Sequence, residues 1–150
     1  MNPFRSLPAM IIFAAMLLSG AAQAMEIRQF DKMADQDQSE YIGNLIVGAE
    51  NALTDEGKPD LAAQIKTLFT TKQPGDADVM GMVEFERNLA LARVADAQRA
   101  EQDPKAHRLE VEDAMLVTLQ KNKIPMSQDF VRGFRAINSN FGPKYPPQKQ

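Results

Sequence analysis

Apolar residues recur three and four positions apart between residues 41 and 53, which is the spacing of one face of an α-helix. The apolar positions are Tyr41, Ile42, Leu45, Ile46, Ala49, Ala52 and Leu53. This helix is predicted to start near Ser39 and to end before Gly57 and Pro59, because glycine suits the position after a helix and proline stops it. Gly43 and Gly48 lie inside the helix, where they could let a neighbouring helix approach closely.

The same spacing predicts a second and a third helix. The second helix is predicted to begin at Pro59 and Asp60. The first turn of a helix leaves its N–H groups unpaired, so the missing N–H of proline costs nothing there, and an acidic side chain interacts favourably with the positive end of the helix dipole. Residues 70–78 contain a Pro-Gly pair and are expected to form a loop. The third helix is expected to be capped by Asp78 and to end just before Pro104. The expected apolar faces are Leu61, Ile65, Leu68 and Phe69 in the second helix and Val79, Met82, Val83, Phe85, Leu89, Ala92, Val94 and Ala95 in the third. The opposite face of the third is expected to carry Glu84, Arg87, Asp96, Arg99 and Glu101.

Two more helices complete the pattern. The fourth is predicted from about Lys105 to Asn122, and the fifth from its cap Ser127 to Gly142. Their inward residues are expected to be Leu109, Val111, Ala114, Met115, Thr118 and Leu119 in the fourth and Phe130, Val131, Phe134 and Ile137 in the fifth. Ahead of all five, Ile27, Phe30 and Met33 recur at threes and allow one short helical turn.

The expected fold class is therefore all-α, a compact bundle or irregular array of about five helices, because no segment alternates with the period of a strand. The helical domain is expected to span residues 25–142, and residues 143–150 read as a disordered, Pro-rich tail. The chain contains no cysteine, so the domain must be held together by packing alone.

Residues 1–24 follow the basic, apolar, small order of a secretory signal peptide. Arg5 precedes an apolar run over residues 9–18, and Ala22 and Ala24 form the small-x-small triplet that signal peptidase accepts. The run is about half of the roughly 20 residues that span a bilayer. Cleavage is expected after Ala24, so that the exported chain begins at Met25, is periplasmic or secreted and keeps no stable membrane anchor.

Removing residues 1–24 takes away one arginine and no acid, which changes the net charge from −3 to −4. Nucleic-acid binding relies on clustered lysine and arginine, so an acidic chain without such a cluster argues against it. A basic membrane-surface helix is disfavoured on the same ground.

Candidate chemistry is sparse in this sequence. With no cysteine and one histidine, the chain lacks the residues of thiolate or His-rich metal sites. His107 and Glu110, three positions apart, would share a helix face and could contribute to a metal site, but an exposed pair beside Arg108 is the simpler interpretation.

Acids on the third and fourth helices could converge as an acid–base pair: Glu84, Glu86, Asp96, Glu110, Glu112 and Asp113. They alternate with arginines, which is typical of a solvated helix face. We therefore predict no catalytic, cofactor-binding or metal-binding residue.

Residues 103–119 carry an Asp-Pro break, a nearby arginine and an apolar helix that closes at Ile124-Pro125. Together with Tyr41-Ile42-Gly43 and Gly48-Ala49, this segment resembles the Rap/Tai immunity proteins of type VI secretion. Met126 stands where that family has cysteine. The resemblance implies a small exported helical protein that protects a bacterium from toxins that degrade the cell wall.

Three functions remain open from the sequence. The first is a non-enzymatic, protein-binding role, with immunity-like inhibition of a toxin as its specific form. The second is a metal-dependent or carboxylate-based hydrolase that uses the acids and His107. The third is a stress-related structural or chaperone-like periplasmic protein.

Overall fold

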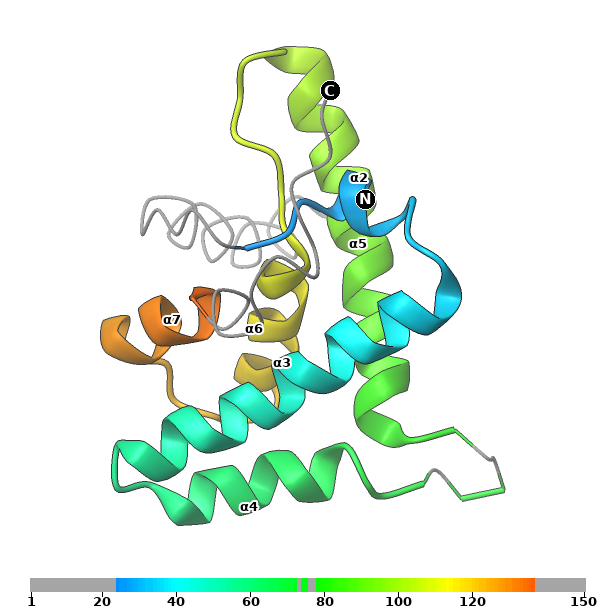
Figure 1. The fold of residues 1–150 in the computed structure, drawn as a ribbon. Coiled ribbons are helices and arrows are strands. Elements are labelled where there is room, and N and C mark those ends of the chain that lie inside the picture. Colours follow the sequence, from blue (N-terminus) through cyan, green and yellow to red (C-terminus); the bar gives the residue numbers. More distant parts are fainter. Residues whose placement is uncertain (1–23, 73, 76–77, 137–150) are drawn as a thin grey trace.

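The computed structural model describes residues 24–72, 74–75 and 78–136 of the chain, and these form an all-α fold (Figure 1). Its helices are α2 (Ile27–Phe30), α3 (Asp35–Asp55), α4 (Pro59–Leu68), α5 (Met80–Gln102), α6 (Val111–Lys121) and α7 (Gln128–Arg135). Within these residues there is no β-strand, and two isolated bridges join Glu26 to Glu110 and Lys72 to Val79. The predicted fold class is confirmed.

Helix α6 is the centre of the fold. Every residue from Val111 to Leu119 is buried, so this helix has no solvent face over nine consecutive positions. It lies between α5 and α7, and α3 crosses in front of it (Figure 1). A helix that is apolar on nearly all sides is stable only inside a core, which explains why the other elements surround α6.

Helices α3 and α4 form an antiparallel pair along one edge of the molecule (Figure 1). Gly57, with φ of 76°, ends α3, and the next amide, Lys58 N, donates to Leu53 O at 2.8 Å. This arrangement satisfies the last carbonyls of the helix and needs the left-handed backbone that glycine adopts easily. Pro59 opens α4 at its first position, so both predicted signals are confirmed.

Helix α5 packs its first turn against the end of α4. A Cβ on Gly81 would lie 2.7 Å from Phe69 Cδ1 and 2.8 Å from Leu68 O, so only glycine fits there. The predicted close approach at Gly43 is wrong, because no atom lies within 4 Å of its Cβ position. Sequence spacing alone did not distinguish these two helical glycines.

Three details of α5 differ from the prediction. Its N-cap is Val79 and not Asp78. Val94, expected in the core, is 59% exposed, whereas Asp96, expected on the solvent face, is 4% exposed. The charged Asp96 is drawn inward by partners on the following connector, described below, which local periodicity does not reveal. The predicted stop before Pro104 is confirmed, since α5 ends at Gln102.

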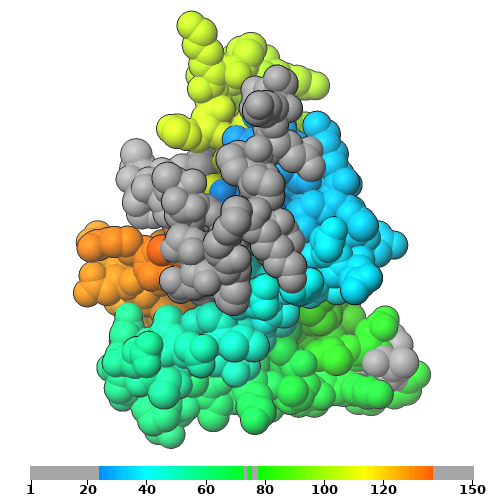
Figure 2. Space-filling view, in the orientation of Figure 1, coloured from blue at the N-terminus to red at the C-terminus, as the bar shows by residue number. Residues whose placement is uncertain are grey.

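The connector between α5 and α6 is not helical, which corrects the prediction of a helix from Lys105. Residues 103–110 form a turn and an extended stretch, and Glu110 is the N-cap of α6. The stretch pairs with the start of the described chain, because Ile27 N donates to Leu109 O at 3.0 Å and Val111 N donates to Met25 O at 2.9 Å. In the space-filling view this connector projects at the top, above the surface formed by α3 and α4 (Figure 2).

The short turn and the fifth predicted helix are present as α2 and α7. Ser127 caps α7, as predicted, by accepting a hydrogen bond from Phe130 N at 3.0 Å. The described residues end at 136, so the predicted continuation to Gly142, the tail at 143–150 and residues 1–23 of the predicted signal peptide lie outside them. None of the described helices combines the length and the apolar character needed to cross a membrane.

Candidate functional site

Three acids at the start of α6 form a buried cluster. The side chains of Glu112 and Asp113 are fully buried, and that of Glu110 is 15% exposed. The prediction of a solvated acidic face is therefore wrong for these residues. Burial of carboxylates requires partners, because an unpaired charge inside a protein is strongly unfavourable.

Arg135, the last residue of α7, is the cation of this cluster. Its side chain is 1% exposed, and Arg135 Nη1 donates to Glu110 Oε1 at 2.6 Å. Arg135 Nη2 donates to Asp113 Oδ1, while Asp113 Oδ2 accepts from Glu110 N at 2.8 Å. One guanidinium therefore links two carboxylates, and Asp113 also caps its own helix.

The carboxylate of Glu112 has different partners and accepts hydrogen bonds from two neutral donors. Tyr41 of α3 donates its hydroxyl to Glu112 Oε1, and the backbone nitrogen of Met25 lies 3.1 Å from Glu112 Oε2. The carboxyl of Glu112 thus ties the first described residues and α3 to the core helix. Both of its oxygens are used in these contacts.

Burial dominates the electrostatics of the cluster. It raises the pKa of Glu110 to about 7, against the opposing effect of Arg135, and it raises the pKa of Glu112 to about 8. Burial also raises the pKa of Asp113 above its usual value, again opposed by Arg135. The pKa of the Tyr41 hydroxyl is raised by burial and then by the charge of Glu112, so tyrosine stays a neutral donor.

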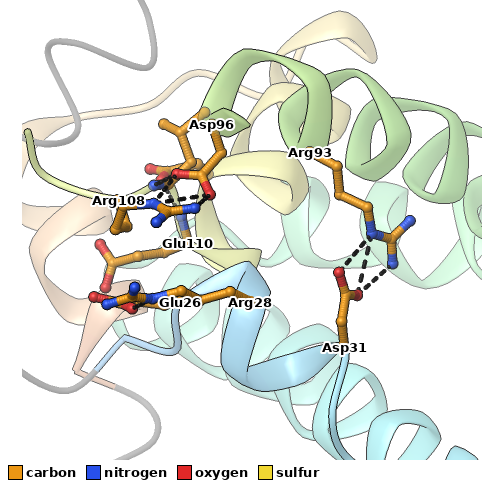
Figure 3. Close-up of polar contacts among 9 residues, drawn as sticks. Glu26, Arg28, Asp31, Arg93, Asp96, Arg108 and Glu110 are labelled. Atoms are coloured by element: carbon orange, nitrogen blue, oxygen red, sulfur yellow. Dashed lines mark hydrogen bonds and ion pairs between the residues drawn. The ribbon is translucent and has the colours of Figure 1, made fainter. Parts of the chain in front are cut away.

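A second buried acid, Asp96 of α5, holds the connector in place. Arg108 faces it with two nitrogens, and the closest contact joins Arg108 Nη2 to Asp96 Oδ2 at 2.6 Å (Figure 3). Leu109 N also donates to Asp96 Oδ1 at 2.7 Å. These bonds satisfy the connector backbone where a helix had been predicted, so Asp96 explains the extended course of the chain there.

The other predicted acids do not join this cluster. Glu84 accepts from Asn122 Nδ2 at 2.6 Å, near the far end of α6, and Glu86 is exposed. His107 is exposed on the connector, so it does not share a helix face with Glu110 as predicted. No group of three His, Cys, Asp or Glu residues in the described part of the chain could hold a metal ion.

The sequence did contain one indication of the cluster. Residues 114–119 are apolar except for Thr118, a pattern that leaves no polar face and is typical of a buried helix. Acids in the first turn of such a helix must be buried with it. Their cation, Arg135, follows only 22 residues after Asp113, and no local pattern connects the two.

Of the residues predicted at the signal-peptide cleavage site, Ala22 lies outside the described residues. Ala24 is half-buried, and Met25 is buried in the core. Comparisons with protein-family models, with curated proteins and with solved structures find no match for this chain.

Proposed function

We propose that this protein is exported to the periplasm or beyond and acts by binding another protein, without bond-making chemistry of its own. The observation that carries the proposal is the outer face of α5. Leu91 and Val94 lie one turn apart and are 57% and 59% exposed. Apolar side chains at the centre of a surface with charged residues around them are typical of protein interfaces.

Helical spacing extends this face along α5. Met80, Arg87, Gln98 and Glu101 share the side of the helix that carries Leu91 and Val94, and all four are exposed. The opposite side of the helix packs on α6. We call these six residues the α5 outer face, and it offers a rigid, preformed surface that loses little conformational entropy on binding.

The buried acids support the same proposal. Glu112 and Asp113 each use both carboxylate oxygens in bonds within the protein, which assigns them to holding the fold together. Asp96 holds the connector in place by accepting hydrogen bonds from Arg108 and Leu109. These groups are thereby engaged in structure and not offered to a substrate.

The specific form of the proposal is an immunity-like inhibitor that covers the cleft of a toxin attacking the cell wall. It is supported by the resemblance to the Rap/Tai proteins and by the predicted export. The acidic net charge of the chain would speed association with a basic cleft.

Site-specific photo-crosslinking tests the binding proposal. A photoreactive amino acid at position 91 is compared with the same amino acid at position 47, because Val47 of α3 is a matched exposed apolar residue at 53%. We expect a crosslinked protein partner from position 91 and none from position 47. No adduct at position 91, or the same adducts at both positions, contradicts the proposal.

The immunity-like form has its own test. The chain is co-expressed in the periplasm with candidate cell-wall amidases, with Leu91→Glu/Val94→Glu as the variant and Val47→Glu as the control. Growth should be rescued by the wild type and the control but not by the variant. Lack of rescue and lack of micromolar association with purified amidases would remove this form and leave the general proposal standing.

A carboxylate-based hydrolase is the second candidate, favoured by Glu110 alone. Its pKa of about 7 suits a general acid near neutral pH, and its side chain is partly exposed. Glu110→Gln would abolish such an activity while retaining the size of the side chain. A peptidoglycan or glycoside substrate panel that gives equal background turnover for both proteins rejects this candidate.

A further inference from the structure

The backbone nitrogen of Met25 faces a buried carboxylate. Met25 N lies 3.1 Å from Glu112 Oε2, although 87 residues separate the two in sequence. Met25 is 7% exposed and Glu112 is 0% exposed. The peptide N–H donates one hydrogen bond to an oxygen that has no access to solvent.

Contacts on the far side of this nitrogen fix its position. Met25 O accepts from Val111 N at 2.9 Å, and Ile27 N donates to Leu109 O at 3.0 Å. The side chain of Met25 belongs to the hydrophobic core. The nitrogen is therefore held in place by contacts between residues 25–27 and residues 109–111.

Among the described residues of the uncut chain, Glu112 is a buried acid whose hydrogen-bond donors are neutral. No cation is paired with it among the described residues, because the guanidinium of Arg135 bonds Glu110 and Asp113 instead. Tyr41 contributes a neutral hydroxyl, and the nearby charge of Glu110 opposes ionisation of Glu112. A buried, ionised carboxylate that has no paired cation strongly destabilises the folded state.

We propose that cleavage after Ala24 converts the Met25 nitrogen into an α-ammonium group that forms a buried ion pair with Glu112. Hydrolysis of the Ala24–Met25 peptide bond consumes one water and leaves a carboxylate on Ala24 and an ammonium on Met25. The ammonium occupies the position of the former amide, now with three N–H donors and a positive charge. Removal of residues 1–24 thus supplies a cation for Glu112, which has none among the residues that the structure describes.

This assignment implies an order of events during export. Before cleavage the fold contains an acid that must stay protonated or unpaired, which weakens it. After cleavage the same fold gains a charge-assisted contact between its first residue and its central helix. The inference depends on the predicted cleavage site and is independent of the binding function proposed above.

The stability of two chains of equal length tests the ion pair. Residue 25 is itself methionine, so a chain translated from this position should begin with the free amino group of Met25, and its intact mass is measured first to check this. Its partner is the same chain acetylated at Met25 N, which keeps one amide N–H and loses the charge. We expect acetylation to raise the unfolding equilibrium constant by about tenfold or more, equivalent to one pKa unit of the amino group or more.

Two controls assign the effect to Glu112. In Glu112→Gln, acetylation should no longer raise the unfolding constant by more than about twofold, because no carboxylate is left to pair with the ammonium, whereas in Glu86→Gln, an exposed acid, the full effect should remain. If Glu112→Gln does not fold, titration of isotope-labelled Met25 in the unaltered chain decides. A pKa of the α-amino group above its usual value of about 8 supports the ion pair, and a value at or below about 8 overturns it.

The cleavage step is checked separately on the natural exported product. An intact mass that corresponds to a chain beginning at Met25 supports cleavage after Ala24, and a mass that corresponds to any other first residue overturns the proposal. If acetylation changes the unfolding constant equally in the wild type and in Glu112→Gln, the ion pair between Met25 and Glu112 is ruled out.

Discussion

Arg135 at the end of α7 and Asp113 in the first turn of α6 form an ion pair in which both side chains are almost completely excluded from solvent, at 1% and 0% exposure. The pair is the only direct charge link from α7 to α6 besides the bond from the same guanidinium to Glu110, within the residues that the structure describes. Because α7 is a helix of eight residues, its orientation depends on a few contacts, and this pair is one of them.

Removal of Arg135 should therefore destabilise the protein strongly. Arg135→Met keeps most of the apolar stem but removes the guanidinium that pairs with Glu110 and Asp113, and we expect a loss of about 3–5 kcal/mol of unfolding free energy. Arg132→Met on the same helix is the control, because its side chain is 69% exposed and its ion pair with Asp129 is on the surface. Urea unfolding measures both, and equal losses would show that the buried cluster does not stabilise the fold.

Asp96 and Asp31 offer a second comparison, because each faces an arginine in a similar two-pronged arrangement (Figure 3). The side chain of Asp96 is 6% exposed and also accepts from Leu109 N, whereas that of Asp31 is 38% exposed. We expect Asp96→Ala to lose about 3 kcal/mol and Asp31→Ala less than about 1 kcal/mol. Loss of the Asp96 contacts should also increase amide hydrogen exchange at Leu109, and an unchanged exchange rate there would contradict the anchoring role.

Local signals predicted much of the fold correctly. Gly57 and Pro59 marked the turn between α3 and α4, and Ser127 marked the start of α7, because each acts within a few residues of its own position. The apolar positions of α6 were also predicted, since helical periodicity depends only on the helix itself.

Long-range contacts account for what the sequence did not predict. The connector at 103–110 was assigned to a helix, but Asp96 and residues 25–27 offer its backbone better partners. Glu112 was assigned to a solvated face, because its donors, Tyr41 and Met25, lie 71 and 87 residues away. Charge alternation alone cannot distinguish acids in water from acids with distant partners.

Gly43 of α3 and Gly81 of α5 should respond in opposite ways to substitution by alanine. Gly43→Ala meets no atom within 4 Å and should stabilise α3 by about 1 kcal/mol, which is the difference in helix propensity. Gly81→Ala places its Cβ 2.7 Å from Phe69 and 2.8 Å from a backbone oxygen, so we expect a net loss of about 1–3 kcal/mol. Thermal unfolding compares the two variants, and a gain in stability for Gly81→Ala would contradict the close packing of α4 on α5.

The acids of the buried cluster should also make stability depend on pH. In the uncut chain, the folded state raises the pKa of Glu110 from 4.5 to about 7 and that of Glu112 from 4.5 to about 8. The chain acetylated at Met25 keeps a neutral amide at the same nitrogen, so we expect the same directions there. The folded chain therefore binds these protons more tightly than the unfolded chain does. The free energy that these two protonated carboxyls contribute to stability is fully present below pH 4.5. It is lost as the pH rises through their folded-state pKa values of about 7 and about 8.

We accordingly expect the unfolding free energy of the acetylated chain to fall between pH 5 and pH 8, by at most about 1.4 kcal/mol per pH unit for each carboxyl. The groups that face Glu112 are Tyr41, Glu110 and the Met25 nitrogen, and Arg135 faces Glu110. Glu112→Gln should flatten the upper part of this decline, because a glutamine does not titrate, and Glu86→Gln should leave it unchanged. Urea unfolding at half-unit pH steps measures the slope. A stability that rises over this range would mean that the buried acids are ionised in the folded chain at neutral pH.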